Sequence, residues 1–320
     1  MIQDGIDANF FPSLAVELFA GLCEVAIRTS MHAPRSNEPS PDLGENQRRA
    51  LISLLADDDA AIAETVRGKL LSYGAVVGEW LRPYLLSEEP LLRRRARQII
   101  THFERQVADT EFLSFCLKQG EEFDVEEGVW LLARTQYPQI NVAGYRAVLD
   151  DFALELRERL DLNGSTEHIL GVLNEFLFQR LKFTGNEKNY YDPENSYLNR
   201  VLDRRTGNPI GLCLVYLLLA RRLKLPMAGI GLPGHFICRY QSSRSEVYVD
   251  VFNFGNLLTK GDCIKYLIRT NHGLHEGHLS PVSARRILLR ICASLHQIYS
   301  QLEAAEEIAR FQHYLVALAK

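Results

Sequence analysis

The sequence lacks the features that mark several large classes of protein. It has no run of about 18 apolar residues, so no helix is expected to cross a membrane. The amino terminus, Met1–Asp7, has neither a basic region nor an apolar core, so no signal peptide is expected. The formal net charge of −4 gives no electrostatic basis for binding nucleic acid or an anionic membrane.

Cysteine is present but scattered, with no Cys-x-x-Cys pair among Cys23, Cys116, Cys213, Cys238, Cys263 and Cys292. This spacing favours reduced thiols in the cytoplasm over a disulfide framework or a zinc site. Three histidines lie at steps of three residues, a pattern that suggests a metal-binding site: His272, His275 and His278. Gly273 and Gly277 disfavour the helix that would align them, so an exposed loop is expected. We therefore predict no metal, no cofactor and a cytoplasmic location.

The chain is long enough for two or more domains, each with a core of its own. Its 320 residues are 47% hydrophobic and 24% charged, which is ordinary for globular proteins. We predict an all-helical region over residues 1–140, a core domain over 141–272 and a helical pair over 273–320. The proline in Gln136–Ile140 favours the first boundary.

The amino-terminal region has a helical pattern throughout. Leu14–Ile27 marks a first helix, and shorter helices are expected near residues 47–55, 60–71, 76–85, 90–103, 111–119 and 124–135. The segments Leu54–Asp58 and Leu85–Glu89 resemble one turn repeated at a spacing of 31 residues. Paired helices with such turns predict a HEAT-like region.

One dense basic run stands out in this region, formed by Arg93, Arg94, Arg95 and Arg97. Glu88, Glu89 and Glu104 are close in sequence, so we expect a solvated helix face with ion pairs. The alternative is a docking patch for an acidic partner.

A buried helix is predicted to carry the first of three chemically active residues. Asn208-Pro209 favours a helix start, because asparagine caps free N–H groups and proline fits the first turn. The apolar run Leu212–Ala220 predicts burial on all sides. Cys213 lies near the amino end, where the helix dipole favours a thiolate. The dipole helps less if the helix begins at Asn208 than if it begins at Gly211.

A β-hairpin is predicted to carry the other two residues. His235–Tyr240 and Val247–Phe252 are rich in strand-forming residues. A symmetric loop between them places Gln241 opposite Glu246. His235 and Asp250 then become diagonal neighbours on one face of the hairpin. A slip of one residue would put them on opposite faces.

The three residues form a candidate catalytic triad of Cys213, His235 and Asp250. Imidazole takes the proton of the thiol, and the carboxylate orients the imidazole. Asn208 is either a second oxyanion donor or a helix cap. Each triad residue also has a structural alternative. Cys213 is then a small buried hydrophobic residue, His235 a core histidine bonded to a backbone carbonyl, and Asp250 a turn cap.

Several motifs resemble a known family. Gly211-Leu-Cys213, Gly234-His235 and Val249-Asp250 are similar to the transglutaminase-like, papain-related core, and longer stretches resemble its SirB-type branch: Phe183–Asn199, Val201–Ile210 and Leu232–Phe236. The resemblance covers roughly Asn141 to Leu267, and a similar module is found in one F-box protein family. It implies an α+β domain with a small antiparallel sheet and chemistry through a thioacyl enzyme. Members of the SirB-type branch often carry another small residue where Cys213 stands.

The carboxyl-terminal region is predicted to form two helices, Val282–Leu302 and Ala305–Leu318. The break at Glu303 rests on polarity, and one continuous helix is the alternative. The pair resembles a single tetratricopeptide-like unit, which needs another surface to bury its apolar face.

Two functions remain open from the sequence. The first is a thiol-dependent amidase, peptidase or acyl transferase that uses Cys213, His235 and Asp250. The second is a catalytically inactive protein-interaction or regulatory module that uses the helical flanks. Both imply a protein or peptide as partner, with no nucleic acid and no membrane.

Overall fold

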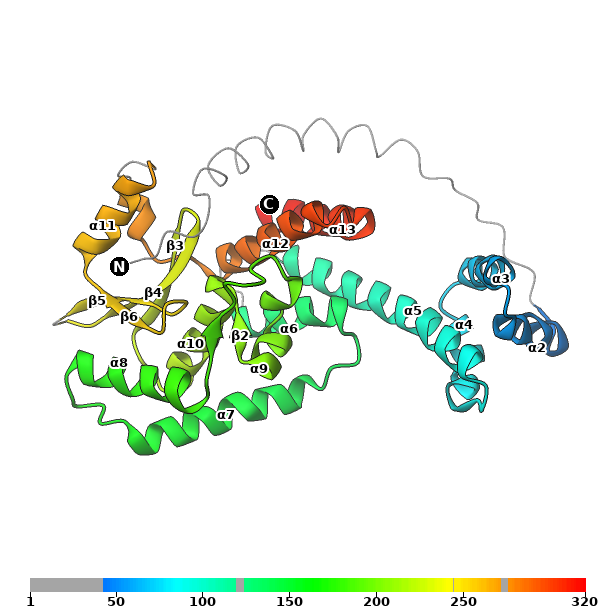
Figure 1. Ribbon diagram of the computed structural model, residues 1–320, viewed down its shortest axis with the longest axis horizontal. Helices are drawn as coiled ribbons and strands as arrows, with labels where there is room; N and C mark the ends of the chain where they lie inside the picture. Colours follow the sequence, from blue (N-terminus) through cyan, green and yellow to red (C-terminus); the bar gives the residue numbers. More distant parts are fainter. Residues whose placement is uncertain (1–42, 119–123, 244, 272–275) are drawn as a thin grey trace. The chain divides into compact units, whose positions relative to one another are not determined.

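The computed structural model describes residues 43–118, 124–243, 245–271 and 276–320 (Figure 1). The helix predicted at Leu14–Ile27 lies outside these residues. Within them the chain forms two compact units. Of the described residues, the larger unit contains those within 113–133 and 140–320, and the smaller unit contains 43–112 and 134–139. The domain boundaries predicted at residues 140 and 272 stay a prediction.

The smaller unit is entirely helical over its described residues. Its elements are α2 (Glu45–Ser53), η2 (Leu54–Ala56), α3 (Ala60–Ser72), α4 (Val77–Leu81), η3 (Arg82–Leu86) and the first part of α5 (Pro90–Cys116). Leu55, Leu70, Val77, Leu81 and Ile99 are fully buried in its core. The sequence placed a separate helix at residues 111–119, whereas α5 runs through to Cys116 without a break.

The turn repeated in the sequence has the same local structure in both copies. The backbone N–H of Asp59 donates to Oδ1 of Asp57 at 2.8 Å, and that of Glu89 donates to Oγ of Ser87 at 3.2 Å. In each copy a 3₁₀ helix ends directly before the accepting residue and an α-helix follows. Short polar side chains favour such turns because they bond the backbone two residues on. The HEAT-like comparison stays a prediction.

Two arginines of the basic run bond backbone carbonyls, which the sequence interpretation did not anticipate. Arg95 donates from Nη1 to the carbonyl oxygens of Leu55 and Asp57, at 2.7 and 2.6 Å. Arg93 donates from Nη1 to the carbonyl oxygen of Ser87 at 2.7 Å. Carbonyl groups at the end of a helix lack hydrogen-bond donors within the helix, and the arginine side chains provide these donors. These side chains therefore fix the two repeated turns.

Replacing Arg95 by methionine should lower the free energy of unfolding of the smaller unit by about 1–2 kcal/mol, because two carbonyls lose a charged donor. The chain has two tryptophans, and Trp80 lies in this unit. Urea unfolding followed by Trp80 fluorescence in a Trp130→Phe background measures the loss. Arg94→Met is the matched control, because Arg94 is exposed on the same helix. Equal losses in the two variants would contradict the capping role.

The larger unit surrounds one buried helix, α10 (Pro209–Arg222). The other helical segments are α6 (Val125–Gln136), α7 (Val142–Arg159), α8 (Thr166–Asn174), η4 (Glu175–Arg180), η5 (Pro193–Asn195), α9 (Leu198–Arg204), α11 (Lys260–Arg269), η6 (Glu276–Leu279), α12 (Ala284–Gln301) and α13 (Ala305–Ala319). Eleven residues of α10 are buried, as its continuous apolar run predicts. Over the described residues, no helix combines the length and the apolar character that a membrane crossing requires.

The main sheet has four antiparallel strands, in the order β3-β4-β5-β6. They are β3 (Met227–Leu232), β4 (His235–Gln241), β5 (Glu246–Asp250) and β6 (Asn256–Leu258). The sequence predicted only β4 and β5. It did not predict β6, and it missed β3, whose two glycines are poor strand formers. A second, parallel pair joins β1 (Thr184–Gly185) to β2 (Thr206–Gly207).

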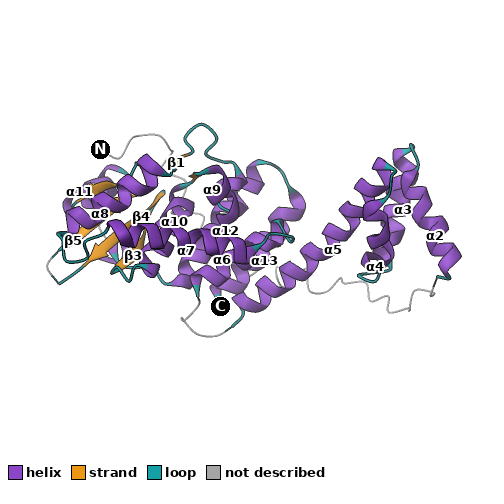
Figure 2. Cartoon of the chain, turned by 90° about the horizontal axis from the view of Figure 1, so that it is seen from below, coloured by secondary structure: helices purple, strands orange, loops and turns teal. Residues whose placement is uncertain are grey.

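Helices cover both faces of this sheet (Figures 1 and 2). α10 packs on β3 and β4. The opposite face forms a core cluster with α11, in which Ile237, Tyr248 and Leu267 are fully buried. Beside β3 runs the segment before α12: the N–H of Val282 donates to the carbonyl of Gly229 at 3.0 Å, and Pro281 bridges to Ile230.

The carboxyl-terminal helices form a pair with a break where the sequence placed it. Glu303 has a left-handed φ of 55° between α12 and α13. The rings of Tyr299 and Phe311 stack across the pair, with centroids 5.5 Å apart. The continuous-helix alternative is therefore excluded, while the tetratricopeptide-like comparison stays a prediction.

Candidate functional site

Asn208 fixes the beginning of α10. Its Oδ1 accepts a hydrogen bond from the N–H of Gly211 at 2.8 Å, and its Nδ2 donates to Oγ of Ser196 at 2.7 Å. Pro209 follows in the first turn. The helix therefore begins directly after Asn208, and Cys213 lies in the second turn, where the dipole has less effect. Asn208 acts as a helix cap.

The Cys213 thiol is enclosed by the protein. Its side chain is 0% exposed, and Sγ donates to the carbonyl oxygen of Phe236 at 3.4 Å. Burial raises the pKa of this thiol well above its usual value, and the neighbouring Cys238 thiol and the charge of Asp250 raise it further. The structure thus holds Cys213 as a neutral S–H group.

His235 and Asp250 are brought together by the β4–β5 hairpin. The predicted register is confirmed, because Gln241 pairs with Glu246. His235 begins β4 and Asp250 ends β5. Nε2 of His235 lies 2.9 Å from Oδ1 of Asp250. The diagonal contact that the register required is therefore present.

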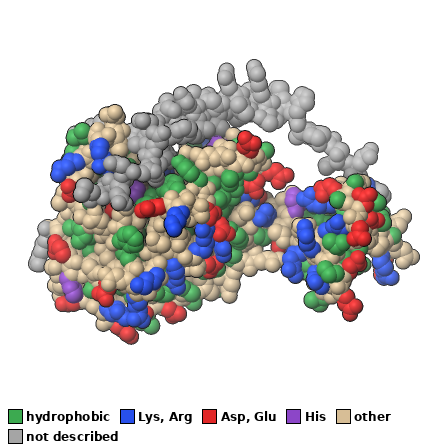
Figure 3. All heavy atoms as spheres, in the orientation of Figure 1, with side chains coloured by type: hydrophobic (Ala, Val, Ile, Leu, Met, Phe, Trp, Pro, Cys, Tyr) green, Lys and Arg blue, Asp and Glu red, His purple; other side chains and the backbone are tan. Residues whose placement is uncertain are grey.

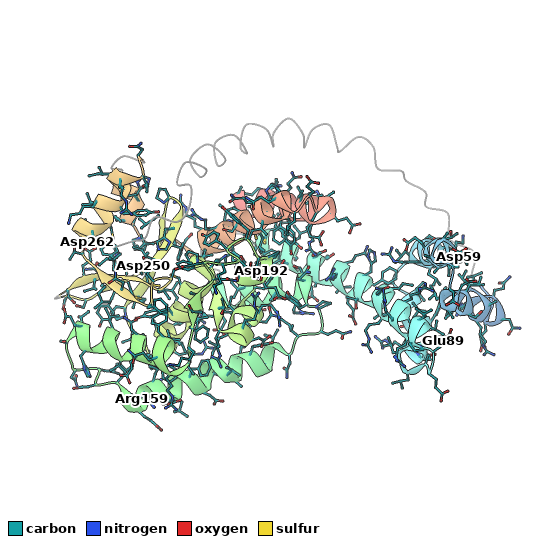
Figure 4. All side chains as sticks on the ribbon, viewed as in Figure 1. Asp59, Glu89, Arg159, Asp192, Asp250 and Asp262 are labelled. Carbon is teal, nitrogen blue, oxygen red and sulfur yellow. The ribbon has the colours of Figure 1, made fainter. Side chains whose placement is uncertain are left out.

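Asp250, labelled in Figure 4, is fully buried. Burial alone would raise the pKa of its carboxyl group. The charge and hydrogen bond of His235 oppose this effect, as do two bonds from Asn253, and the pKa is lowered overall. Nδ2 of Asn253 donates to Oδ2 at 2.8 Å, and its backbone N–H donates to Oδ1 at 3.4 Å. An ionised carboxylate only accepts hydrogen bonds, so Nε2 of His235 carries a proton.

The second ring nitrogen of His235, Nδ1, hydrogen-bonds to no described residue. Its ring neighbours are Phe252 and Tyr266, with centroid distances of 6.3 and 6.2 Å. No hydrogen bond joins Cys213 to His235 within the described residues, because the sulfur is directed to Phe236. The site therefore contains a bonded imidazole–carboxylate pair and, separately, a thiol bonded to a backbone carbonyl.

Strand alternation accounts for this separation. Successive side chains of β4 point to opposite faces of the sheet. Cys238 lies on the α10 side, next to Cys213, and its Sγ is 3.9 Å from the Cys213 carbonyl oxygen. His235 is three residues earlier and therefore has the other orientation, toward Tyr266 of α11.

The asparagine-rich loop before α9 bonds mainly to itself. Nδ2 of Asn186 donates to Oδ1 of Asn195 at 2.9 Å, and Nδ2 of Asn195 donates to the carbonyl oxygens of Asn189 and Tyr190, at 2.8 and 3.1 Å. This arrangement positions the Tyr190 ring 6.1 Å from that of Phe252. The loop thus places the Tyr190 ring beside Phe252, whose ring in turn neighbours His235.

Three residues that contact His235 or one of its neighbours were not singled out from the sequence: Tyr190, Tyr266 and Arg290. They come from a loop, from α11 and from α12, so no local motif connects them. As for metals, no cluster of three histidine, cysteine or acidic side chains occurs where the structure is described. His272 and His275 lie outside that part of the chain.

Comparison with known proteins agrees with this architecture. Residues 143–293 match the family model described as the Transglutaminase-like superfamily, so the helix-rich α+β unit contains a transglutaminase-like domain. A UPF0162 protein of Pseudomonas aeruginosa is 30% identical over 189 residues, which cover 58% of this chain and 68% of the relative. The chain therefore belongs to the UPF0162 family.

Other relatives match over shorter shares of their length. A UPF0162 protein of Xylella fastidiosa (strain Temecula1) is 33% identical over 191 residues, 56% of this chain, and the match spans 66% of that relative. F-box only protein 21 of Mus musculus is 35% identical over 137 residues, which are 40% of this chain and 21% of that protein. No solved structure matches the chain at a significant level.

Proposed function

We propose that this chain is a non-catalytic transglutaminase-like protein that binds a protein or peptide beside His235. The observation that carries the proposal is the state of Cys213, which is fully buried and donates its S–H to the Phe236 carbonyl. A cysteine nucleophile must be a thiolate with a base in reach, and its sulfur must meet the substrate carbon. Cys213 meets none of these requirements in the structure.

His235 favours binding more than turnover. Asp250 fixes the imidazole through Nε2, Nδ1 hydrogen-bonds to no described residue, and the rings of Phe252 and Tyr266 lie beside the imidazole. A neutral imidazole oriented in this way can accept a hydrogen bond from a ligand, and an imidazolium can donate one. Both roles need no thiol.

The relatives support the proposal because the matching domain occurs in proteins of different length and composition. The matching stretch makes up 21% of F-box only protein 21 but 68% of the Pseudomonas relative. Acidic and basic side chains are interspersed on the face shown in Figure 3, which suits a protein partner better than a polyanion. The motif Leu232–Phe236 and its companions support a place in the SirB-type branch.

A thiol enzyme is the competing proposal, with Cys213 as nucleophile, His235 as base and Asp250 as the group that orients the base. The superfamily and the His235–Asp250 hydrogen bond favour it. It requires α10 or β4 to move so that the sulfur leaves Phe236 and approaches Nδ1. The two proposals differ sharply in the reactivity that they give to the thiol.

Iodoacetamide labelling, followed site by site with mass spectrometry, separates them. We expect Cys213 in the native protein to react at least about a hundredfold more slowly than in the denatured protein, because labelling requires an opening of the fold. Cys263 is the internal reference, since it is also fully buried and burial raises its pKa to about 12. The two residues should react at similarly low rates, and His235→Ala should change both rates by the same factor, because it acts on them only through the opening of the fold.

Rapid labelling of Cys213 below pH 7 would overturn the binding proposal if His235→Ala abolished it. That pattern identifies a thiolate stabilised by an imidazolium. The thiol enzyme would then be the function that the site performs.

A further inference from the structure

Arg205 caps the carboxyl end of α9 in an unusual backbone conformation. Its φ of 53° lies in the left-handed region, which costs free energy in a residue that has a Cβ atom. Glycine or asparagine usually occupies such a helix end. The main chain fixes the position, because the N–H of Thr184 donates to the Arg205 carbonyl oxygen at 2.9 Å. The chain thus keeps an arginine where the backbone favours other residues, and strain of this kind clusters at functional sites.

Two phenylalanine rings hold the Arg205 side chain. Its guanidinium carbon, Cζ, lies over the ring of Phe152, on α7, at 4.8 Å and over the ring of Phe183 at 5.0 Å. A cation over an aromatic ring is attracted by the electrons of that ring. These two contacts use the charge of the guanidinium but none of its five N–H donors.

Within the described part of the chain, the guanidinium of Arg205 makes no hydrogen bond. Nη1 is enclosed by protein atoms, whereas Nε and Nη2 are not. Donors in a folded protein are rarely left without an acceptor, so an arginine with all of them unused requires an explanation. The Nε–Nη2 edge is the part of this guanidinium that another molecule can reach.

Carboxylates near Arg205 in the sequence are bonded to other donors. Oδ2 of Asp192 accepts from Nη1 of Arg204 at 2.7 Å, and Oδ1 of Asp203 accepts from the Tyr145 hydroxyl at 2.9 Å. Asp203 acts on Arg205 only through its charge, which raises the pKa of the guanidinium against the lowering effect of burial. A carboxylate from another molecule would therefore supply the acceptor that the described residues do not.

We infer that Arg205 binds a carboxylate group of another molecule through its Nε–Nη2 edge. The two N–H groups of this edge are parallel and coplanar, so they match the two oxygens of a carboxylate. The phenyl rings cannot hydrate an anion, and the desolvation penalty grows with charge, so a monoanionic carboxylate fits better than a phosphate dianion. An acidic side chain, a chain terminus or a free carboxylic acid can provide the group. This site uses no residue of the pair at His235 and is therefore independent of the proposed function.

The test titrates the full chain with acetate, with acetamide as its uncharged counterpart and with inorganic phosphate as a competing oxyanion, all at constant ionic strength. NMR reports on the Arg205 Nε–H and on the amide of Thr184, which is bonded to the Arg205 carbonyl. We expect saturable shifts of both signals with acetate, none with acetamide, and weaker binding of phosphate. This comparison needs no variant, so it does not depend on how a substitution affects folding.

A short peptide with blocked ends and one glutamate identifies the source of the carboxylate. If a partner provides an acidic side chain, this peptide should shift the same two signals at least as strongly as acetate at equal concentration. Its glutamine counterpart should leave them unchanged. If acetate acts and the glutamate peptide does not, the site takes a free carboxylic acid, and the carboxylate assignment stands.

Substitutions then assign the binding to Arg205. Arg205→Asn removes the guanidinium and keeps a residue that tolerates the left-handed backbone. The dissociation constant for acetate, followed at Thr184, should rise at least about tenfold, because two charged hydrogen bonds are lost. Arg205→Lys should retain part of the affinity, since it keeps the charge without the paired donors. Lys224→Asn is the matched control and should leave the affinity unchanged, because Lys224 is an exposed cation with a φ of 57° directly beyond α10.

Four results would overturn the inference: no saturation with acetate, equal shifts with acetamide, tighter binding of phosphate, or equal affinity in Arg205→Asn and the unsubstituted protein. In each case the ring contacts of Arg205 only fasten the end of α9 to α7. The labelling of Cys213 does not depend on Arg205, so failure of this inference and failure of the proposed function are distinguishable.

Discussion

Replacement of Asp250 by alanine should lower the free energy of unfolding of the larger unit by about 3–5 kcal/mol. The carboxylate is fully buried and accepts hydrogen bonds from His235 and Asn253. Its removal leaves buried donors without partners and creates a cavity, and both effects destabilise the fold. Urea unfolding monitored by Trp130, which is buried in α6, measures the change in a Trp80→Phe background.

The charge of Asp250 can be separated from its shape with asparagine. The folded-state pKa is lowered, so ionisation stabilises the fold above the unfolded pKa of about 3.9, and this stabilisation is lost as the pH falls through the folded value. The advantage of the unsubstituted protein over Asp250→Asn should therefore be full at neutral pH and shrink below about pH 4.

Asp151→Ala is the matched control for both measurements, because Asp151 is an exposed acidic residue of α7. We expect its effect to stay within about 0.5 kcal/mol. If Asp250→Ala cost no more than this control, the His235–Asp250 pair would not contribute to the stability of the unit.

Gly255→Ala should destabilise the larger unit by about 2–4 kcal/mol. Gly255 follows β5 with a φ of 72°, and an added Cβ would overlap the side-chain amide of Asn174. That amide cannot move freely: Nδ2 of Asn174 donates to the Gly255 carbonyl at 2.7 Å, and Oδ1 accepts from the Tyr216 hydroxyl at 3.1 Å. Backbone strain and overpacking therefore add together.

Gly171→Ala serves as the control for this substitution. Gly171 is exposed in α8, and an added Cβ would meet nothing within 4 Å. Alanine there should leave the unit unchanged or stabilise it by up to about 1 kcal/mol, because alanine favours the helix. Similar melting curves for Gly255→Ala and the unsubstituted protein would show that the turn after Asp250 adapts without strain.

The sequence predicts the local framework of the site well, because that framework depends on short-range patterns. The cap at Asn208 and the apolar run after it define α10. The polar loop between two β-rich segments defines the register that joins His235 to Asp250. Both patterns act over a few residues, where propensity and periodicity decide the structure.

Features that depend on distant contacts were missed or misjudged. β3 contains Gly229, which lies against the ring of Phe236, and tertiary packing outweighs its poor strand propensity. The partners of Arg95 lie 40 and 38 positions away in sequence. The bond from Cys213 to Phe236 likewise depends on how α10 packs on the sheet, which no motif specifies.

The edges of the main sheet restrict how a peptide can attach. Pro281 and Val282 occupy the outer side of β3, and the last strand, β6, has only three residues. Strand addition needs a long row of unsatisfied backbone groups, and a short strand or a covered edge does not supply one. A peptide bound as proposed would therefore be recognised through its side chains or its terminus, and the same protected edges disfavour strand-mediated aggregation.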